Sequence, residues 1–137
     1  MILCDAGVLL CLVDRTQPLH QACRSVVIQI DSPLITTWSC LTEAMYLSLH
    51  RGGWKMQKQL GKLLLDRLLS VYEIQAEDYG RLFELMEQYQ DRPMDLADAS
   101  LVIVAERTGA RKILTFDSDF LFYRIKNKDT FDVISVQ

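Results

Sequence analysis

Four acidic residues of this chain stand where they could share one pocket. Asp5 follows the apolar run 1–4, and Asp117 follows the apolar run 112–116. Glu43 and Asp98 lie inside helical patterns, each among mostly small or apolar neighbours. Carboxylates that converge on one site repel each other, and a bound divalent cation removes that repulsion. The residue types therefore favour a site for Mg²⁺ or Mn²⁺, which prefer oxygen ligands, over a zinc site.

Asp98 is the acid whose position is hardest to explain by structure alone. The segment 93–109, PMDLADASLVIVAERTG, is largely apolar, and no Arg or Lys follows Asp98 at helical spacing before Arg107. An unpaired carboxylate in apolar surroundings costs roughly several kcal/mol. The same reasoning applies to Glu43 in the segment TTWSCLTEAMYL. We therefore expect these two carboxylates to serve a ligand.

Two further aspartates have a simpler explanation. Asp95 precedes Asp98 by three residues, which is the spacing of the N-cap and N3 positions of a helix. Asp119 lies in the turn SDFLFY and could cap it in a similar way. We predict that both residues are caps, and we keep them as secondary candidates for the site.

The elements that would position the acids alternate along the chain. Apolar runs predict strands at 1–4, 33–37, 70–75, 112–116 and 131–136. Helical patterns predict helices at 6–14, 17–30, 38–53, 54–69, 76–90 and 93–109, with Gly52 and Gly53 ending the third. Apolar strands separated by helices predict a three-layer α/β fold with a parallel sheet. The carboxyl ends of its strands would then bring Asp5 and Asp117 to the same edge.

The composition narrows the class of protein. The chain has 137 residues, half of them hydrophobic, which predicts a single domain over 1–137. Its net charge of −3 excludes binding of nucleic acid through bulk charge, so phosphate contacts must come from local patches. No apolar run approaches the ~18 residues of a membrane span. The four cysteines lie in apolar runs and are predicted to be buried and reduced: Cys4, Cys11, Cys23 and Cys40. Together these features predict a cytoplasmic protein.

Taken in order, the segments ILCDAGVLL, TTWSCLTEAMY and DLADASLVIVAERTGARKILTFDSDF resemble the PIN domain family. Within that family the chain is similar to the VapC-like ribonucleases of bacterial toxin–antitoxin modules. The resemblance implies a PIN-like sheet with strand order 3-2-1-4-5 and an acidic quartet of Asp5, Glu43, Asp98 and Asp117. It also implies Mg²⁺- or Mn²⁺-dependent hydrolysis of phosphodiester bonds in RNA.

Further expectations follow from the same resemblance. We expect Asp5 and Asp98 to bind the metal directly and Glu43 and Asp117 to bind it directly or through water. A homodimer and an antitoxin protein are the expected partners, beside the RNA substrate. The chain departs from the family at Gly7, where a hydroxyl or amide residue is usual two positions after the first Asp. The loss of that contact is expected to reduce metal affinity.

RNA also needs cations on the protein to meet its phosphates. One cluster falls at helical spacing around 51–62, and another follows the fourth strand: Arg51, Lys55, Lys58 and Lys62, then Arg124, Lys126 and Lys128. A solvated helix face explains the first cluster equally well. Trp38 and Trp54 are predicted to be core or interface residues rather than base-stacking residues. His20 and His50 are predicted to lie at the surface or at an edge rather than to bind a metal.

Two other classes of protein share some of these features. A signalling receiver domain also binds Mg²⁺ in an α/β fold, but it needs paired acids after the first strand and a lysine after the last. Here only Asp5 follows the first strand, and no lysine follows 131–136. A non-catalytic interaction module with the PIN fold remains the alternative, supported by Gly7 and opposed by the complete quartet.

Overall fold

The computed structural model describes residues 1–136 and is built on one sheet of five parallel strands. Strand β1 (Ile2–Cys4) lies at its centre, and Leu3 pairs with both neighbouring strands. The sheet order is β3 (Leu69–Tyr72), β2 (Leu34–Thr37), β1, β4 (Lys112–Leu114) and β7 (Asp132–Ile134). This order confirms the predicted 3-2-1-4-5, with β7 as the fifth strand.

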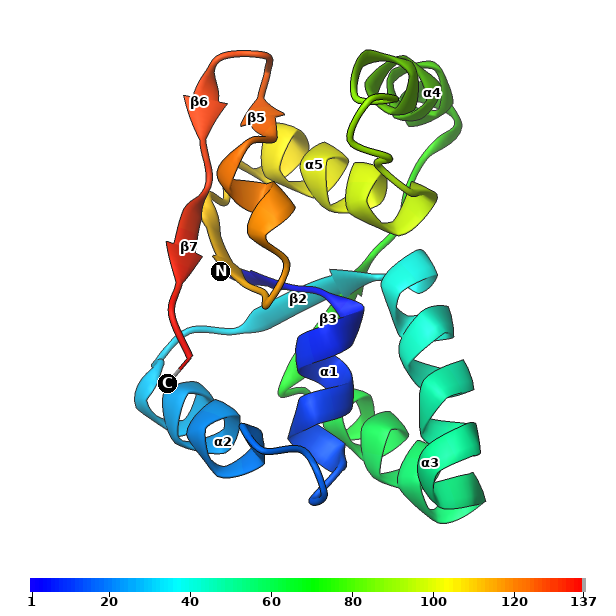
Figure 1. The fold of residues 1–137 in the computed structure, drawn as a ribbon, viewed down its shortest axis with the longest axis vertical. Helices are drawn as coiled ribbons and strands as arrows, with labels where there is room; N and C mark the ends of the chain where they lie inside the picture. The colour runs from blue at the N-terminus through cyan, green and yellow to red at the C-terminus, as the bar shows by residue number, and fades with distance from the viewer. Residues whose placement is uncertain (137) are drawn as a thin grey trace.

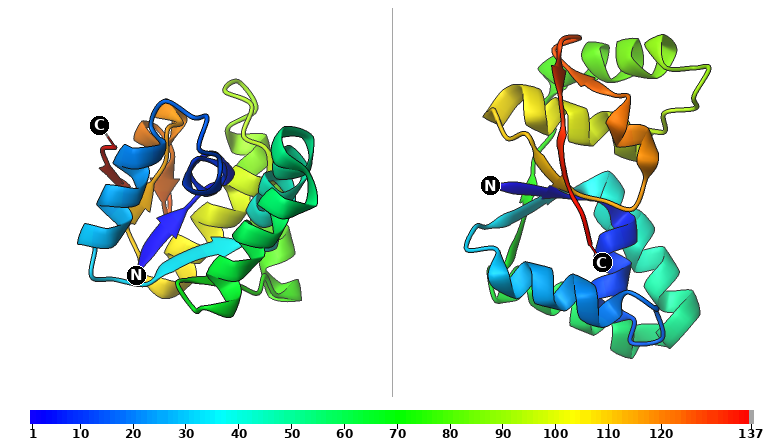
Figure 2. Two further views of the ribbon diagram at one scale, coloured as in Figure 1. Left: turned by 90° about the horizontal axis from the view of Figure 1, so that it is seen from below. Right: turned by 60° about the vertical axis from the view of Figure 1, so that its left-hand side comes forward.

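Two layers of helices cover the sheet. Helices α4 (Tyr79–Gln88) and α5 (Leu96–Thr108) lie on one side of it, above the sheet in Figure 1. Helices α1 (Ala6–Val13), α2 (His20–Gln29) and α3 (Trp38–Leu65) lie on the other side, and both layers are visible in the right-hand view of Figure 2. The predicted three-layer α/β fold is therefore confirmed.

Helix α3 joins two helices that the sequence predicts separately. Its axis turns at Gly53, whose φ of 67° and ψ of −162° are not helical. Glycine reaches this conformation without strain because it has no Cβ atom. The second helix ends at Leu65 rather than at 69, since Leu69 already pairs with Leu34 in the sheet. Strand β3 accordingly covers 69–72 instead of the predicted 70–75.

The segment between β4 and β7 contains structure that the sequence pattern does not indicate. A short 3₁₀ helix, η2 (Ser118–Leu121), is followed by an antiparallel hairpin of β5 (Arg124–Ile125) and β6 (Asp129–Thr130). Lys126 and Asn127 have φ of 53° and 58°, the left-handed conformation that tight hairpin turns require. A further 3₁₀ turn, η1 (Ala76–Asp78), precedes α4.

The core is centred on β1, β4 and α5. Helix α5 is apolar nearly all round because it packs on the sheet on one side and on α4 on the other. All the cysteines are buried and free, as predicted. The prediction for His20 is wrong: its side chain is buried, and its Nδ1 atom lies 2.7 Å from the carbonyl oxygen of Cys11. No helix within residues 1–136 is long and apolar enough to cross a membrane.

Candidate active site

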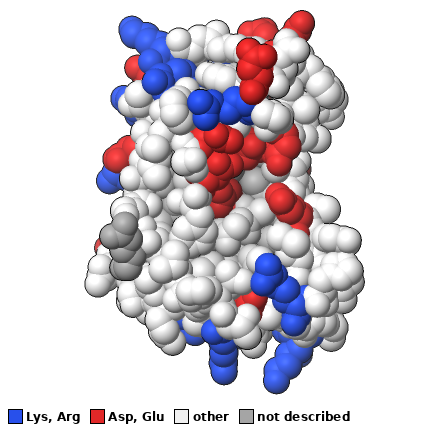
Figure 3. Space-filling view, in the orientation of Figure 1, with Lys and Arg blue, Asp and Glu red and all other residues white. Residues whose placement is uncertain are grey.

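A cavity of about 340 Å³ opens beyond the carboxyl ends of β1 and β4, where α1, α3 and α5 begin or pass. The structure brings all four predicted acids together in its wall, and Asp95 joins them. The cavity is lined by Asp5, Glu43, Asp95, Asp98, Asp117, Ala6, Gly7, Cys40, Ala97 and Phe116. Acidic side chains accordingly gather in a hollow at the middle of the molecule in Figure 3.

Asp5 is held from two sides. It is the N-cap of α1, where its Oδ1 accepts a hydrogen bond of 3.2 Å from the backbone N–H of Val8. Its Oδ2 accepts a short hydrogen bond from the hydroxyl of Thr115, which lies just beyond β4. The Thr115 hydroxyl oxygen in turn accepts from the backbone N–H of Asp117 at 2.9 Å. Thr115, which the sequence analysis did not single out, therefore connects the first and the last acid of the quartet.

Asp95 and Asp98 form a reciprocal pair at the start of α5. Asp95 is the N-cap, as predicted, and its Oδ1 accepts from the Asp98 N–H at 2.8 Å. Asp98 Oδ2 accepts a longer bond of 3.4 Å from the Asp95 N–H. Asp95 makes the tighter capping bond, and one carboxylate oxygen of Asp98 has no such bond within residues 1–136. Both carboxylates face the cavity.

The prediction that Asp119 caps its turn is wrong. The 3₁₀ helix η2 begins at Ser118, so Asp117 is the N-cap and accepts from the Asp119 N–H at 2.9 Å. Asp119 instead forms an ion pair of 3.2 Å with Arg92. The Arg92 guanidinium lies over the Phe122 ring, 3.7 Å from its centroid. Arg92 therefore ties the loop before α5 to the segment that carries Asp117.

Burial and mutual repulsion shift the ionisation of the acids. Burial raises the pKa of Asp5 to about 6, although its hydrogen bonds from Thr115 and Val8 oppose the rise. Burial, followed by the charge of Asp95, raises the pKa of Asp98 to about 7. The pKa of Glu43 is raised by the same two causes. The cavity is therefore a place where added positive charge would be strongly favoured.

The donor atoms of this cavity fit Mg²⁺ or Mn²⁺ better than zinc. Burial raises the pKa of the Cys40 thiol to about 11, so the only sulfur in the wall stays protonated. The remaining donors are carboxylates. Within residues 1–136, no group of three or more His, Cys, Asp or Glu side chains is arranged to hold a metal ion. Mg²⁺ commonly takes only one or two carboxylates and completes its shell with water, so two acids of the quartet are enough.

The predicted RNA-binding cations are not part of the wall of the acidic cavity within residues 1–136, and several have other partners. Arg51 pairs with Asp14 at 3.6 Å, and Lys62 pairs with Asp66 at 2.9 Å. One nitrogen of Arg124 donates to three backbone carbonyls of the preceding residues, so its side chain stabilises its own loop. Among the residues described, none of the predicted cations lines the acidic cavity: Arg51, Lys55, Lys58, Lys62, Arg124, Lys126 and Lys128. Figure 3 shows basic side chains mainly towards the two ends of the molecule, with one group beside the acidic hollow.

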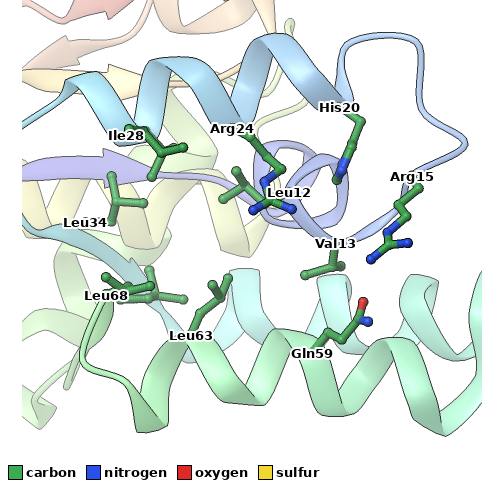
Figure 4. A pocket seen from close by; sticks show the side chains of 12 residues that line it. Leu12, Val13, Arg15, His20, Arg24, Ile28, Leu34, Gln59, Leu63 and Leu68 are labelled. Carbon is green, nitrogen blue, oxygen red and sulfur yellow. The ribbon is translucent and has the colours of Figure 1, made fainter.

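A second cavity of about 280 Å³ lies on another part of the surface, between α2 and the second half of α3. Its wall is mostly apolar and includes Leu12, Ile28 and Leu63. The side chains of Arg15 and Arg24 point towards this space in Figure 4. It has none of the acids of the first cavity and is the shape of a groove between two helices.

The comparisons with known proteins agree with this geometry. A model of the PIN domain matches residues 2–128. Ribonuclease VapC26 of Mycobacterium tuberculosis is 26% identical over 113 residues, which cover 82% of this chain and 84% of that protein. The crystal structure of VapC20 from the same organism, described as a sarcin–ricin loop cleaving toxin, has a TM-score of 0.80 at 18% identity. That match covers 87% of this chain and 92% of the VapC20 chain. The chain belongs to the PIN domain family.

Proposed function

We propose that this protein is a Mg²⁺- or Mn²⁺-dependent endoribonuclease and the toxin of a toxin–antitoxin pair. The observation that carries the proposal is the convergence of Asp5, Glu43, Asp98 and Asp117 in one cavity. Membership of the PIN family and similarity to the ribonuclease VapC26 support the reaction class.

The acids would have different roles at the site according to their positions. Asp5 and Asp98, whose pKa values are raised to about 6 and about 7, would bind the cation. Glu43 and Asp117 would bind it directly or through water. A divalent cation bound there supplies an activated water and offsets charge on the phosphate. Thr115 keeps Asp5 oriented by its hydrogen bond, and Asp95 keeps Asp98 at the start of α5. These fixed orientations are what a preorganised nuclease site needs.

The direct test is RNA cleavage by the purified protein with Mg²⁺, with Mn²⁺ and with EDTA, alongside calorimetric titration of Mg²⁺. We expect cleavage only with metal, and we expect Asp98→Asn to weaken Mg²⁺ binding at least about tenfold. Absence of cleavage under all three conditions, with Mg²⁺ affinity unchanged in Asp98→Asn, would reject the proposal. It would instead favour the non-catalytic PIN module, for which Gly7 is the supporting observation.

We propose that Arg92 contacts the substrate phosphate. Its side chain is half-exposed and pairs with Asp119, two residues after Asp117. Arg92→Ala should raise KM about tenfold and lower the salt dependence of binding by about one charge. Lys58→Ala is the control, because Lys58 is exposed on α3 outside the acidic cavity. Steady-state cleavage at several salt concentrations measures both. A larger effect of Lys58→Ala would assign phosphate binding to the α3 cluster instead.

We also propose a homodimer. Trp38, Tyr46 and Leu49 lie on one side of the first half of α3 and are about half-exposed, and Trp54 after the bend is 70% exposed. Light scattering at micromolar concentration should give twice the chain mass of 15.8 kDa. Leu49→Glu should shift the protein to the monomer. A wild-type protein that is monomeric at this concentration would contradict the proposal.

The groove between α2 and α3 is the surface that we propose for the antitoxin. An amphipathic helix with an acidic edge would match its apolar floor and the cations Arg15 and Arg24 (Figure 4). Co-expression with a candidate antitoxin that carries such a helix should give a complex without RNase activity. Ile28→Glu, at an exposed position of the groove, should release active protein. A complex that survives this change unaltered would place the antitoxin elsewhere.

A further inference from the structure

One aromatic side chain lines the acidic cavity within residues 1–136, and it has no part in binding the cation. Phe116 lies between Thr115 and Asp117 and is 44% exposed. The buried neighbour Thr115 is fixed by its bond to Asp5, and the Asp117 N–H is fixed by its bond to Thr115. The backbone on both sides of Phe116 is thus held, and its ring faces the cavity instead of the core.

Gly7 keeps the space between this ring and Asp5 open. A Cβ atom at position 7 would lie 3.8 Å from Asp5 Oδ1 and 3.8 Å from Cδ2 of Phe116. Both distances are ordinary contacts, so a small side chain would fit, but anything longer would stand between the acid and the ring. The departure at Gly7 therefore leaves the metal-binding carboxylate and an exposed aromatic ring in one continuous space.

The exposed ring of Phe116 offers a ligand an apolar surface beside the acidic centre. Apolar ring surface in water is unfavourable, and carboxylates cannot pair with the negative face of an aromatic ring. A nucleobase can cover the ring, because every base has a flat π-face that stacks on Phe, Tyr or Trp. The base would be attached to a phosphate that the acids and their cation receive.

We propose that Phe116 stacks on the base of one nucleotide beside the scissile phosphate and makes the enzyme prefer a purine there. The proposal rests on the proposed ribonuclease function and adds a source of sequence preference to it. Stacking is stronger for the larger purine ring system, and preferences of this origin are modest and need no hydrogen bonds to base edges. Gly7 contributes by placing no side chain between Asp5 and the ring.

The test uses a pool of RNA oligonucleotides with randomised sequence, cleaved by the full-length protein with Mg²⁺, and sequencing of the new ends. We expect the wild type to show a purine preference at one position beside the cut. Phe116→Ala and Phe116→Leu should lose that preference, and kcat/KM on a fixed oligonucleotide should fall roughly 5- to 150-fold. Phe116→Tyr should retain both. Phe83→Ala is the control, because Phe83 is an exposed phenyl group on α4 outside the cavity.

An abasic nucleotide at the preferred position makes the test specific. It should slow the wild type by about the factor that Phe116→Leu causes, and it should slow Phe116→Leu little further, because the stacking partner is already gone. Leu keeps the apolar bulk of the side chain, so this variant remains informative even if Phe116→Ala does not fold. Equal preferences in the wild type and Phe116→Leu, with cleavage intact, would overturn the stacking role and leave the ribonuclease function standing. A wild type that cleaves no RNA with either metal would overturn both.

Discussion

Asp98→Asn should lower RNA cleavage by about three orders of magnitude or more, whereas Asp95→Asn should stay within a few-fold of the parent. The two residues differ in role although both face the cavity. Asp95 caps α5 through its bond to the Asp98 N–H, and asparagine also caps helices well. Asp98 is the proposed metal ligand, and replacing it removes a negative charge that binds the cation.

The same pair of variants separates catalysis from folding. In EDTA, Asp98→Asn should melt at the same temperature as the parent or higher, because it removes a charge whose burial, and then its repulsion by Asp95 and Asp117, raise the pKa of Asp98. The measurements are cleavage with Mg²⁺ and thermal melts in EDTA on matched samples. Loss of cleavage in Asp95→Asn together with an active Asp98→Asn would show that the two roles are reversed.

Much of this fold could be predicted because its strands and helices are strongly patterned. The apolar runs at 1–4, 33–37 and 112–116 are too short for helices, and the first and third are followed by Asp5 and Asp117, which suit helix caps. Parallel strands then place Asp5 and Asp117 at one edge without knowledge of side-chain contacts. The cap at Asp95 follows from its spacing to Asp98 alone.

The parts that were missed depend on contacts between distant segments. The 3₁₀ helix η2 begins at Ser118, so its N-cap is Asp117 and not Asp119. Only the tertiary structure shows that Asp119 pairs with Arg92, 27 residues earlier. His20 is buried because it bonds to the Cys11 carbonyl of the preceding helix. Phe116 reads as the end of a strand, but β4 ends at Leu114, and Phe116 lies beyond it in the wall of the cavity. Local pattern contains none of this information.

The metal-free protein should lose stability as the pH rises from 5 to 8. Burial raises the pKa of Asp5 from 3.8 to about 6 and that of Asp98 from 3.8 to about 7. At a pH between the unfolded value of 3.8 and the folded values of about 6 and about 7, the unfolded chain has released protons that the folded protein still holds. The free energy of unfolding therefore falls as the pH increases through this range. The pKa of Asp14 is lowered, so its opposite contribution changes below this range.

The fall in melting temperature between pH 5 and pH 8 in EDTA should be about 5 °C, allowing for solvent screening at a partly exposed site. Mg²⁺ binds the ionised carboxylates, so the rise in melting temperature that it causes should be near zero at pH 5 and largest at pH 8. Asp98→Asn should flatten both dependences, since the variant has no proton to lose at that position. Scanning fluorimetry of the two proteins at several pH values, with EDTA or Mg²⁺, gives all four curves. A melting temperature of the metal-free protein that rises steadily from pH 5 to pH 8 would mean that both carboxylates are ionised in the folded protein throughout this range. The electrostatic argument for a cation at this site would then be wrong.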